Sequence, residues 1–445
     1  MTERFHLGLY TMPPVTHHSM ATWRHPLNVP EGRGFNMFHK KVWQYIGRLI
    51  EEAKFDFFFA ADTEGVYRAY EDRIDPAIRY AAQVPVFDQT ITLSFVAAAT
   101  DHIGAVSTLS INGTPPYVAS RKFATLDHLS GGRAGWNVVT AFQVSAAQNL
   151  GRDDQLSHDA RYDRAEEYME VCYQLWDSWD ENAVVMDSEN ETFADPALVH
   201  EINFVGEHYR SRGPLNVNRP PQGHPLIVQA GSSTRGIRFA AKHAEMVFTI
   251  QPFREGMKQY YDELKSVMHK EFGRDPASCK VYFSVQPVVG ETEEIARQKA
   301  ELHNSLVPVQ AGMTIFSGHT TYDWSVHDLD LPLTELNTVV PGIQGLVDMY
   351  TRVSEGREVR LADVAIRHGI AVGSPQVVGT PTQVADWMEE TMDFVGGDGF
   401  MFTPTHAPGA IEDFIDMVVP ILRQRGLIRS DYVEGGTLRD NVLAF

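Results

Sequence analysis

The sequence is poor in cysteine and in positive charge, and it contains no long apolar run. Only two of its 445 residues are cysteines, and they lie outside any Cys-X-X-Cys or Cys/His ligand spacing, so neither a disulfide framework nor a zinc site is supported. The chain has 38 Lys and Arg against 58 Asp and Glu, a formal charge of -20. That charge repels nucleic acid phosphates and anionic membrane surfaces. Without an 18-residue apolar run or a signal-peptide pattern, we expect a cytoplasmic protein with no membrane partner.

Common nucleotide-binding and hydrolase motifs are also missing. No GxGxxG, GxxxxGK[ST], GxSxG or HExxH occurs at a usable position, which weakens the Rossmann, P-loop, α/β-hydrolase and zincin interpretations. His17, His18 and His25 are grouped near the N-terminus, but no carboxylate lies at helical spacing from them. We therefore predict no metal site and expect solvated or hydrogen-bonded loop histidines.

Short apolar runs alternate with helix-length amphipathic stretches along the whole chain. Runs that are apolar on both faces are typical of buried parallel strands. Eight strand candidates occupy residues 5–10, 55–60, 103–110, 134–139, 225–230, 246–250, 280–285 and 399–402. Eight strands alternating with helices predict an α/β fold of the (β/α)8 TIM-barrel type, with residues 1–445 in a single domain, rather than an open doubly wound sheet.

Three stretches interrupt the repeat and are interpreted as insertions, at about residues 11–35, 180–223 and 311–375. Residues 180–223 contain alternating and proline-rich segments that indicate a strand-containing insertion. The other two are long and irregular in sequence. Because loops that follow barrel strands extend over the active-site end, we place both there. Residues 311–375 contain Gly312, Gly318, Gly342, Gly345 and Gly356, and we expect them to form a lid that is mobile without a bound ligand.

Polar residues occur at the ends of three predicted strands, where a barrel carries its chemistry. Asp62 follows the second strand, Thr108 lies on the third and Asn137 on the fourth. For Asn137, the residues alone favour a satisfied polar side chain inside the barrel.

The fifth predicted strand leads into a Gly-Ser-Ser turn, residues 231–233, that opens a helix. Free backbone N–H groups, two hydroxyls and a helix dipole together suit a phosphate group. Spacing supports equally well the alternative that Ser232 or Ser233 is only the N-cap of that helix.

Three segments carry a resemblance to a known family: residues 123–140 (FATLDHLSGGRAGWNVVT), 158–167 (HDARYDRAEE) and 229–240 (QAGSSTRGIRFA). They resemble the bacterial-luciferase-like flavin-dependent monooxygenases, in the nitrilotriacetate, dibenzothiophene-sulfone and dimethyl-sulfide monooxygenase branch, and the similarity runs essentially end to end. It implies a TIM barrel that receives reduced FMN (FMNH2) from a separate NAD(P)H:flavin reductase and uses O2 to oxygenate a small organic substrate. It also implies a homodimer or homotetramer.

The resemblance assigns roles to individual residues of this chain. The residues implied to contact the flavin are Asp62, Thr108, Asn137, His158, Tyr162, Ser232 and Ser233. Ser233, with Ser232, would hold the phosphate, whereas Arg235 could either add charge there or point to solvent. His25 and His319 are the candidates for polar groups near the reactive part of the flavin, because both lie in segments assigned to the mouth; either could instead be structural.

Aromatic and methionine residues near the predicted mouth favour an apolar pocket. They are Met12, Met20, Trp23, Phe35, Phe59, Tyr67, Phe142, Phe253 and Trp324. With no dense Arg/Lys cluster there, an apolar organosulfur compound is favoured over a polycarboxylate. The alternatives are a deazaflavin-dependent oxidoreductase of the same superfamily, a non-catalytic flavin-binding protein and a pure interaction module.

Overall fold

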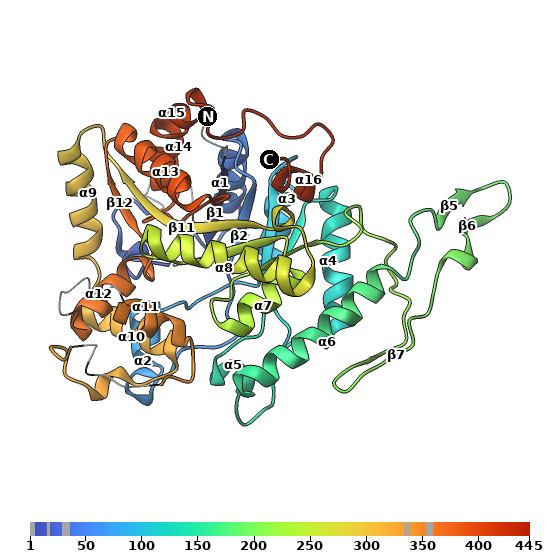
Figure 1. Cartoon of the computed structure of the whole chain (residues 1–445), viewed down its shortest axis with the longest axis horizontal. Coiled ribbons are helices and arrows are strands. Elements are labelled where there is room, and N and C mark those ends of the chain that lie inside the picture. The colour runs from blue at the N-terminus through green and yellow to red at the C-terminus, as the bar shows by residue number, and fades with distance from the viewer. Residues whose placement is uncertain (1–4, 16–17, 29–35, 333–334, 336–338, 353–358) are drawn as a thin grey trace.

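Eight parallel strands form a closed barrel in the computed structural model, which describes residues 5–15, 18–28, 36–332, 335, 339–352 and 359–445 (Figure 1). The barrel strands are β1 (His6–Thr11), β2 (Phe57–Ala60), β3 (Gly104–Ser110), β4 (Ala134–Val139), β9 (Leu226–Gln229), β10 (Met246–Thr249), β11 (Lys280–Val289) and β13 (Gly399–Phe402). The ring is closed because β1 pairs with both β2 and β13, and β10 pairs with β11. The predicted (β/α)8 fold is confirmed.

The apolar strand runs fill both faces of the barrel wall. In β2 all four residues are buried. Phe57 and Phe59 belong to a cluster with Tyr282 and Met401 in the barrel interior, whereas Phe58 packs with the surrounding helices. Successive strand residues point to opposite faces, so an uninterrupted apolar run serves both layers.

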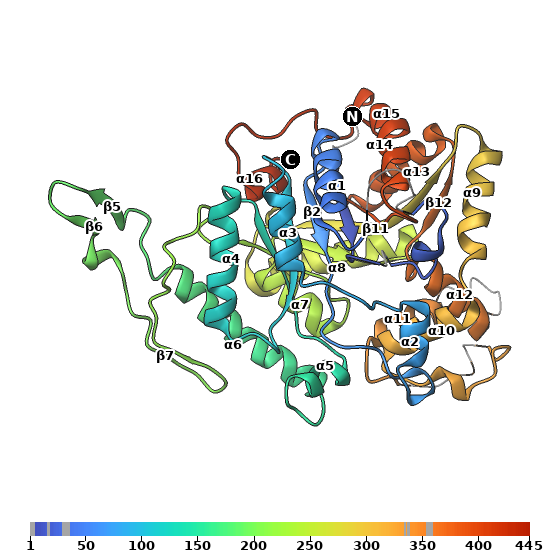
Figure 2. The ribbon, with the colours of Figure 1, turned by 180° about the vertical axis from the view of Figure 1, so that it is seen from behind.

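Helices cover the outside of the barrel (Figure 2). They are α1 (Lys40–Glu52), α3 (Gln89–Ala97), α4 (Pro116–Ser130), α6 (His158–Trp176), α7 (Thr234–His243), α8 (Arg254–Phe272), α9 (Glu293–Ser305), α13 (Pro381–Val395), α14 (Gly409–Met417) and α15 (Val419–Gln424). Two short helices, α2 (Asp75–Tyr80) and α5 (Val144–Asn149), lie instead beyond one end of the barrel (Figure 1). The helix ends follow the sequence: α13 begins with a Thr380/Gln383 capping box and ends at Gly396, whose φ is 71°. Within the described ranges, no helix has the length and hydropathy needed to span a bilayer.

The insertion at residues 180–223 forms an arm that projects from the barrel (Figures 1 and 2). It contains two antiparallel pairs, β5 (Val184–Asp187) with β6 (Thr192–Ala194) and β7 (Phe204–Val205) with β8 (Arg210–Ser211). Glu167 of α6 anchors the second pair by accepting the backbone N–H groups of residues 207, 208 and 209.

The prediction that residues 311–375 are irregular is wrong. They contain most of α10 (Val309–Thr320), all of α11 (Gln344–Arg352) and α12 (Leu361–Ala371), and they lead into β12 (Gln376–Gly379), which extends the sheet beside β11. These helices share a hydrophobic cluster of their own, so the described parts of the segment form a packed cap. The expectation that this segment moves when no ligand is bound stays a prediction.

Glycines in this cap serve close packing. A Cβ at Gly312 would lie against the carbonyl group of Ala365 in α12, and one at Gly318 would overlap the ring of Tyr67. The lack of a side chain at both positions therefore allows α10 to pack closely against α12 and Tyr67, and neither glycine indicates a hinge. Gly356, which also suggested a flexible lid, lies outside the described residues.

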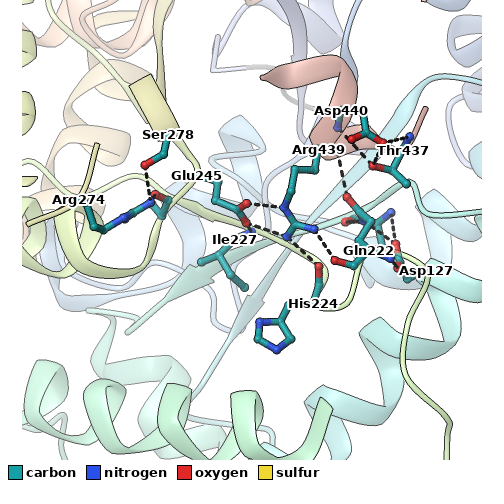
Figure 3. A network of polar contacts seen from close by, with 12 residues as sticks. Asp127, Gln222, His224, Ile227, Glu245, Arg274, Ser278, Thr437, Arg439 and Asp440 are labelled. Atoms are coloured by element: carbon teal, nitrogen blue, oxygen red, sulfur yellow. Dashed lines mark hydrogen bonds and ion pairs between the residues drawn. The ribbon is translucent and has the colours of Figure 1, made fainter. Parts of the chain in front are cut away.

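The end of the barrel opposite the cap is closed by α16 (Leu438–Val442). Leu438 belongs to the interior cluster of the barrel, against Gly104 and Gly135 at the starts of β3 and β4. Next to it, Arg439 donates to both carboxylate oxygens of Glu245 and to the carbonyl oxygens of Gln222 and His224 (Figure 3). This network fastens the C-terminal helix to the barrel.

Candidate active site

A cavity of about 820 Å³ opens at the carboxyl ends of the barrel strands. Its wall includes Tyr10 of β1, Thr108 of β3, Asn137 of β4 and Thr249 of β10, and the cap adds His319 and residues 342–346. This is the end at which TIM barrels hold their active sites.

One end of the cavity collects the residues predicted to hold a phosphate. His158, Tyr162, Ser232 and Ser233 all line it. Ser233 is the N-cap of α7 and accepts the Gly236 N–H at 3.0 Å, and its hydroxyl also lies 3.1 Å from His158 Nε2. The two interpretations of Ser233 are therefore compatible, since it caps the helix and faces the cavity. The N-termini of α6 and α7 both lie here, and their dipoles favour an anion.

Arg161 belongs to this end of the cavity and was not predicted. It lies in the first turn of α6, lines the cavity and is 5% exposed. No carboxylate pairs with it within the described part of the chain, and its buried Nε has no hydrogen-bond partner there. Burial lowers the pKa of Arg161, but a guanidinium stays charged. A buried, uncompensated positive charge beside a hydroxyl-rich turn indicates that this end binds an anion.

Arg235, the other candidate cation, points away from the cavity. Its guanidinium forms an ion pair with Asp163 of α6 on the protein surface, and Arg235 is not a lining residue. The sequence left both placements open, and the structure gives the solvent-facing one.

The middle of the cavity is lined by Asp62, Thr108 and Asn137. Asn137 Nδ2 donates to Thr108 Oγ1 at 2.9 Å, while its buried Oδ1 has no partner among the described residues. If Asn137 were only a hydrogen-bonded residue of the barrel interior, its Oδ1 would have a donor, so the structure does not support that interpretation. Asp62 accepts the Thr63 N–H at 2.7 Å, and burial raises the pKa of Asp62 to about 7.

Asp62 should make the stability of the protein depend on pH. An unfolded Asp titrates near pH 4, whereas the pKa of folded Asp62 is about 7. Between these values the folded state holds a proton that the unfolded state has lost, so the free energy of unfolding falls as pH rises, by an amount on the order of 4 kcal/mol. Asp62→Asn should flatten this dependence in urea unfolding at pH 4.5 and 7.5. Equal pH dependence in both proteins would contradict it.

His319 lines the cavity, but from a helix. It lies in the last turn of α10 and is 6% exposed. Its Nδ1 is 2.9 Å from His368 Nε2, and the Tyr67 ring meets it edge-on. Burial lowers the pKa of His319 to about 3, so its ring is neutral at neutral pH.

The structure places His25 away from the cavity, against our prediction that it faces the reactive flavin. It is buried but is not a lining residue. Its ring stacks on His406, from the loop after β13, with 3.9 Å between centroids, and its Nδ1 accepts the Leu27 N–H at 3.2 Å. These contacts fix the ring in a position where it does not line the cavity. His17, considered with it, lies outside the described residues.

His18 also lines the cavity, although the sequence analysis named it only as a loop residue. Its Nε2 makes a short hydrogen bond with the hydroxyl of Tyr10. Burial raises the pKa of Tyr10, so the phenol stays neutral. The sequence offered one indication of this contact: side chains alternate between the two faces of β1, and this alternation turns Tyr10 toward the barrel interior.

Several apolar side chains line the cavity. Of the aromatic and methionine residues expected near the mouth, those that line the cavity are Met12, Phe59, Tyr67, Phe142 and Phe253. Met20 and Trp324 pack in separate clusters, Trp23 is largely exposed, and Phe35 lies outside the described residues.

Comparisons with known proteins agree with this geometry. The family described as luciferase-like monooxygenase matches residues 40–399. The chain is 39% identical to a dibenzothiophene-sulfone monooxygenase of Rhodococcus erythropolis (strain XP), over 99% of this chain and 96% of that protein. It is 37% identical to nitrilotriacetate monooxygenase component A of Aminobacter aminovorans, over 94% and 92%. A crystal structure of riboflavin lyase with modified FMN and riboflavin superposes with a TM-score of 0.90, at 32% identity, covering 100% of this chain and 96% of that chain.

Proposed function

Since this chain belongs to the luciferase-like monooxygenase family, and is thus a flavin-dependent monooxygenase, we propose that it uses FMNH2 from a separate NAD(P)H:flavin reductase. With O2 it oxygenates a small, apolar organosulfur compound. The observation that carries this proposal is the uncompensated charge of Arg161 beside the serine turn. A relative whose name specifies a component A supports division of the activity between two proteins.

The side chains around the cavity fit FMN. Ser232, Ser233, His158, Tyr162 and Arg161 would hold its phosphate, because they supply hydroxyl, imidazole and guanidinium donors at two helix N-termini. When bound, reduced FMN supplies the electrons that activate O2.

Farther into the barrel, the polar residues suit the ring system of the flavin. The open Asn137 Oδ1 can accept an N–H from the ring, and Thr108 and Asp62 lie on the same wall. The packed cap over the cavity would keep water from the reacting groups.

The charges around the cavity favour a neutral substrate. Arg161 is the one Arg or Lys among the lining residues, which also include Asp62, Glu64, Glu255 and Glu263. Once Arg161 pairs with the flavin phosphate, a polycarboxylate would meet acidic groups without a cationic partner. The sulfone named for one relative is closer to this chemistry than the nitrilotriacetate named for the other.

The function is tested by turnover with FMNH2 from a generic reductase, against thioethers, sulfones and aminopolycarboxylates. We expect oxygenated product from the neutral sulfur compounds and no NADH oxidation by this chain alone. NADH oxidation without a reductase would remove the two-component proposal. Stoichiometric FMN binding without product from any substrate would favour a flavin-binding protein, and hydride transfer with a deazaflavin would favour the oxidoreductase alternative.

We further propose that the protein forms a homodimer through the outer face of α3 and α4. Ile91 and Phe95 are exposed one turn apart on α3, and Val118 and Leu129 are exposed on the adjacent α4, Leu129 to 82%. Several exposed apolar side chains on two adjacent helices are typical of an interface. Light scattering should give the dimer mass, and Ile91→Lys with Leu129→Lys should halve it. The matched change Phe193→Lys, on the arm, should not. A parent monomer would contradict the proposal.

A further inference from the structure

Three buried side chains from the three cap helices form a hydrogen-bonded chain that reaches the cavity. His319 Nδ1 lies 2.9 Å from His368 Nε2, and His368 Nδ1 lies 3.1 Å from the hydroxyl of Tyr350. His319 is on α10, Tyr350 on α11 and His368 on α12. Of the three, only His319 lines the cavity. His368 is 0% exposed and Tyr350 is 3% exposed, so both act through His319.

The direction of the hydrogen bonds follows from Tyr350. Its hydroxyl has one proton and, among the described residues, one hydrogen-bond partner, His368 Nδ1. If the Tyr350 oxygen instead accepted a hydrogen bond from His368 Nδ1–H, the buried O–H of Tyr350 would have no acceptor, which is unfavourable. Tyr350 therefore donates to His368 Nδ1, and the proton of His368 lies on Nε2.

The same reasoning fixes the tautomer of His319. His368 Nε2–H donates to His319 Nδ1, so the ring proton of a neutral His319 lies on Nε2. No partner is recorded for that Nε2 within the described ranges, and it is not a buried, unsatisfied atom. It therefore faces the open cavity with its proton.

The surroundings keep His319, His368 and Tyr350 uncharged. Aromatic rings of Phe316, Tyr67 and Phe142 pack against the two histidines. Among the described residues, the other titratable groups that act here are His18, which acts on His368, and Arg367, which acts on Tyr350. Burial lowers the pKa of both histidines and raises that of Tyr350. These three hydrogen-bonded side chains are thus unsuited to passing a proton from one to the next, because that would leave Tyr350 as a buried phenolate.

We propose that His368 and Tyr350 are positioning residues, which hold His319 as a neutral N–H donor pointing into the cavity through Nε2. His319 then serves as a hydrogen-bond donor to an oxygen atom that gains negative charge during oxygenation, and not as a general base. This catalytic part rests on the proposed function, whereas the tautomer does not.

The tautomer can be measured directly. Long-range 1H–15N spectra of histidine-labelled protein, with the His319 signal identified by its loss in His319→Asn, should show proton on Nε2 from pH 6 to 8. Tyr350→Phe keeps the ring but removes the donor, and should give a mixture of tautomers. A matched control is Tyr322→Phe, since Tyr322 bonds His327 at 2.8 Å in the same segment and neither lines the cavity. It should leave the His319 signal unchanged.

The functional readout is product formed per FMNH2 oxidised. Tyr350→Phe should lower it about 2- to 12-fold, the equivalent of one hydrogen bond, and Tyr322→Phe should not. A parent protein with the His319 proton on Nδ1, or a Tyr350→Phe spectrum identical to the parent, would overturn the proposal. The parent spectrum decides even if the variant does not fold. It also needs neither flavin nor substrate, so it is independent of a failure to find oxygenase activity.

Discussion

Replacing Arg161 with methionine is expected to weaken FMN binding about 100-fold and to stabilise the flavin-free protein. The loss of affinity corresponds to about 3 kcal/mol, typical of a hydrogen-bonded buried charge pair. The gain in stability, about 1–2 kcal/mol, arises because Arg161 is buried without a carboxylate partner among the described residues. Flavin titration by fluorescence and urea unfolding of the apoprotein measure the two effects.

Weaker flavin binding together with a more stable apoprotein would identify Arg161 as a ligand-binding arginine, because replacing a structural arginine would lower stability. Arg235→Met, at the surface pair with Asp163, should leave flavin affinity unchanged. Ser233→Ala should cost about 1–3 kcal/mol of flavin binding and should also weaken the start of α7, because Ser233 is its N-cap. Unchanged affinity in Arg161→Met, or a destabilised apoprotein, would show that the positive charge is balanced in some other way.

Arg439→Ala should produce the largest loss of stability, about 3 kcal/mol in urea unfolding. The change leaves Glu245 without its partner and removes donors from the carbonyl oxygens of Gln222 and His224 (Figure 3). Removing one partner of a largely buried ion pair lowers stability by more than the intact pair adds to it, because the remaining charge is left buried without a partner.

The control for this variant is Arg68→Ala. Its ion pair with Asp72 is exposed, with side chains 61% and 87% accessible, so no resolvable change in the unfolding midpoint is expected. Equal stability of Arg439→Ala and the parent would mean that α16 is held by the packing of Leu438 alone.

The order of strands and helices could be predicted because each barrel strand is a short apolar run between helix signals. The cap could not. Ten of the twelve residues of α10 are buried, so the helix has no polar face and no amphipathic period to detect. Gly312 and Gly318, which suggested a loop, are there because α12 and Tyr67 approach so closely.

The candidate site was predictable where a motif carried it. Ser232, Ser233, His158 and Tyr162 lie in segments shared with the family, and all line the cavity. Arg161 adjoins Tyr162 in the same segment, but its importance depends on the absence of a nearby carboxylate, which no linear pattern records.

The position of His25 could not be predicted from the sequence. A loop histidine can turn to either side of a wall, and the stacking of His25 on His406, almost 400 positions away, decided the side. Contacts between segments so distant in the sequence leave no local signal.

Closure of the barrel joins residues that are made at very different times. His6 of β1 pairs with Gly399 of β13, about 390 residues later, and the stacking of His6 on Phe445 comes later still. At about 5–20 residues per second, β1 would wait roughly 20–80 s on the ribosome before its second neighbour emerged. Through that interval a flat apolar edge is available to other chains. The yield of this protein in a cell should therefore depend on chaperones that shield nascent strands, even when the finished barrel is stable.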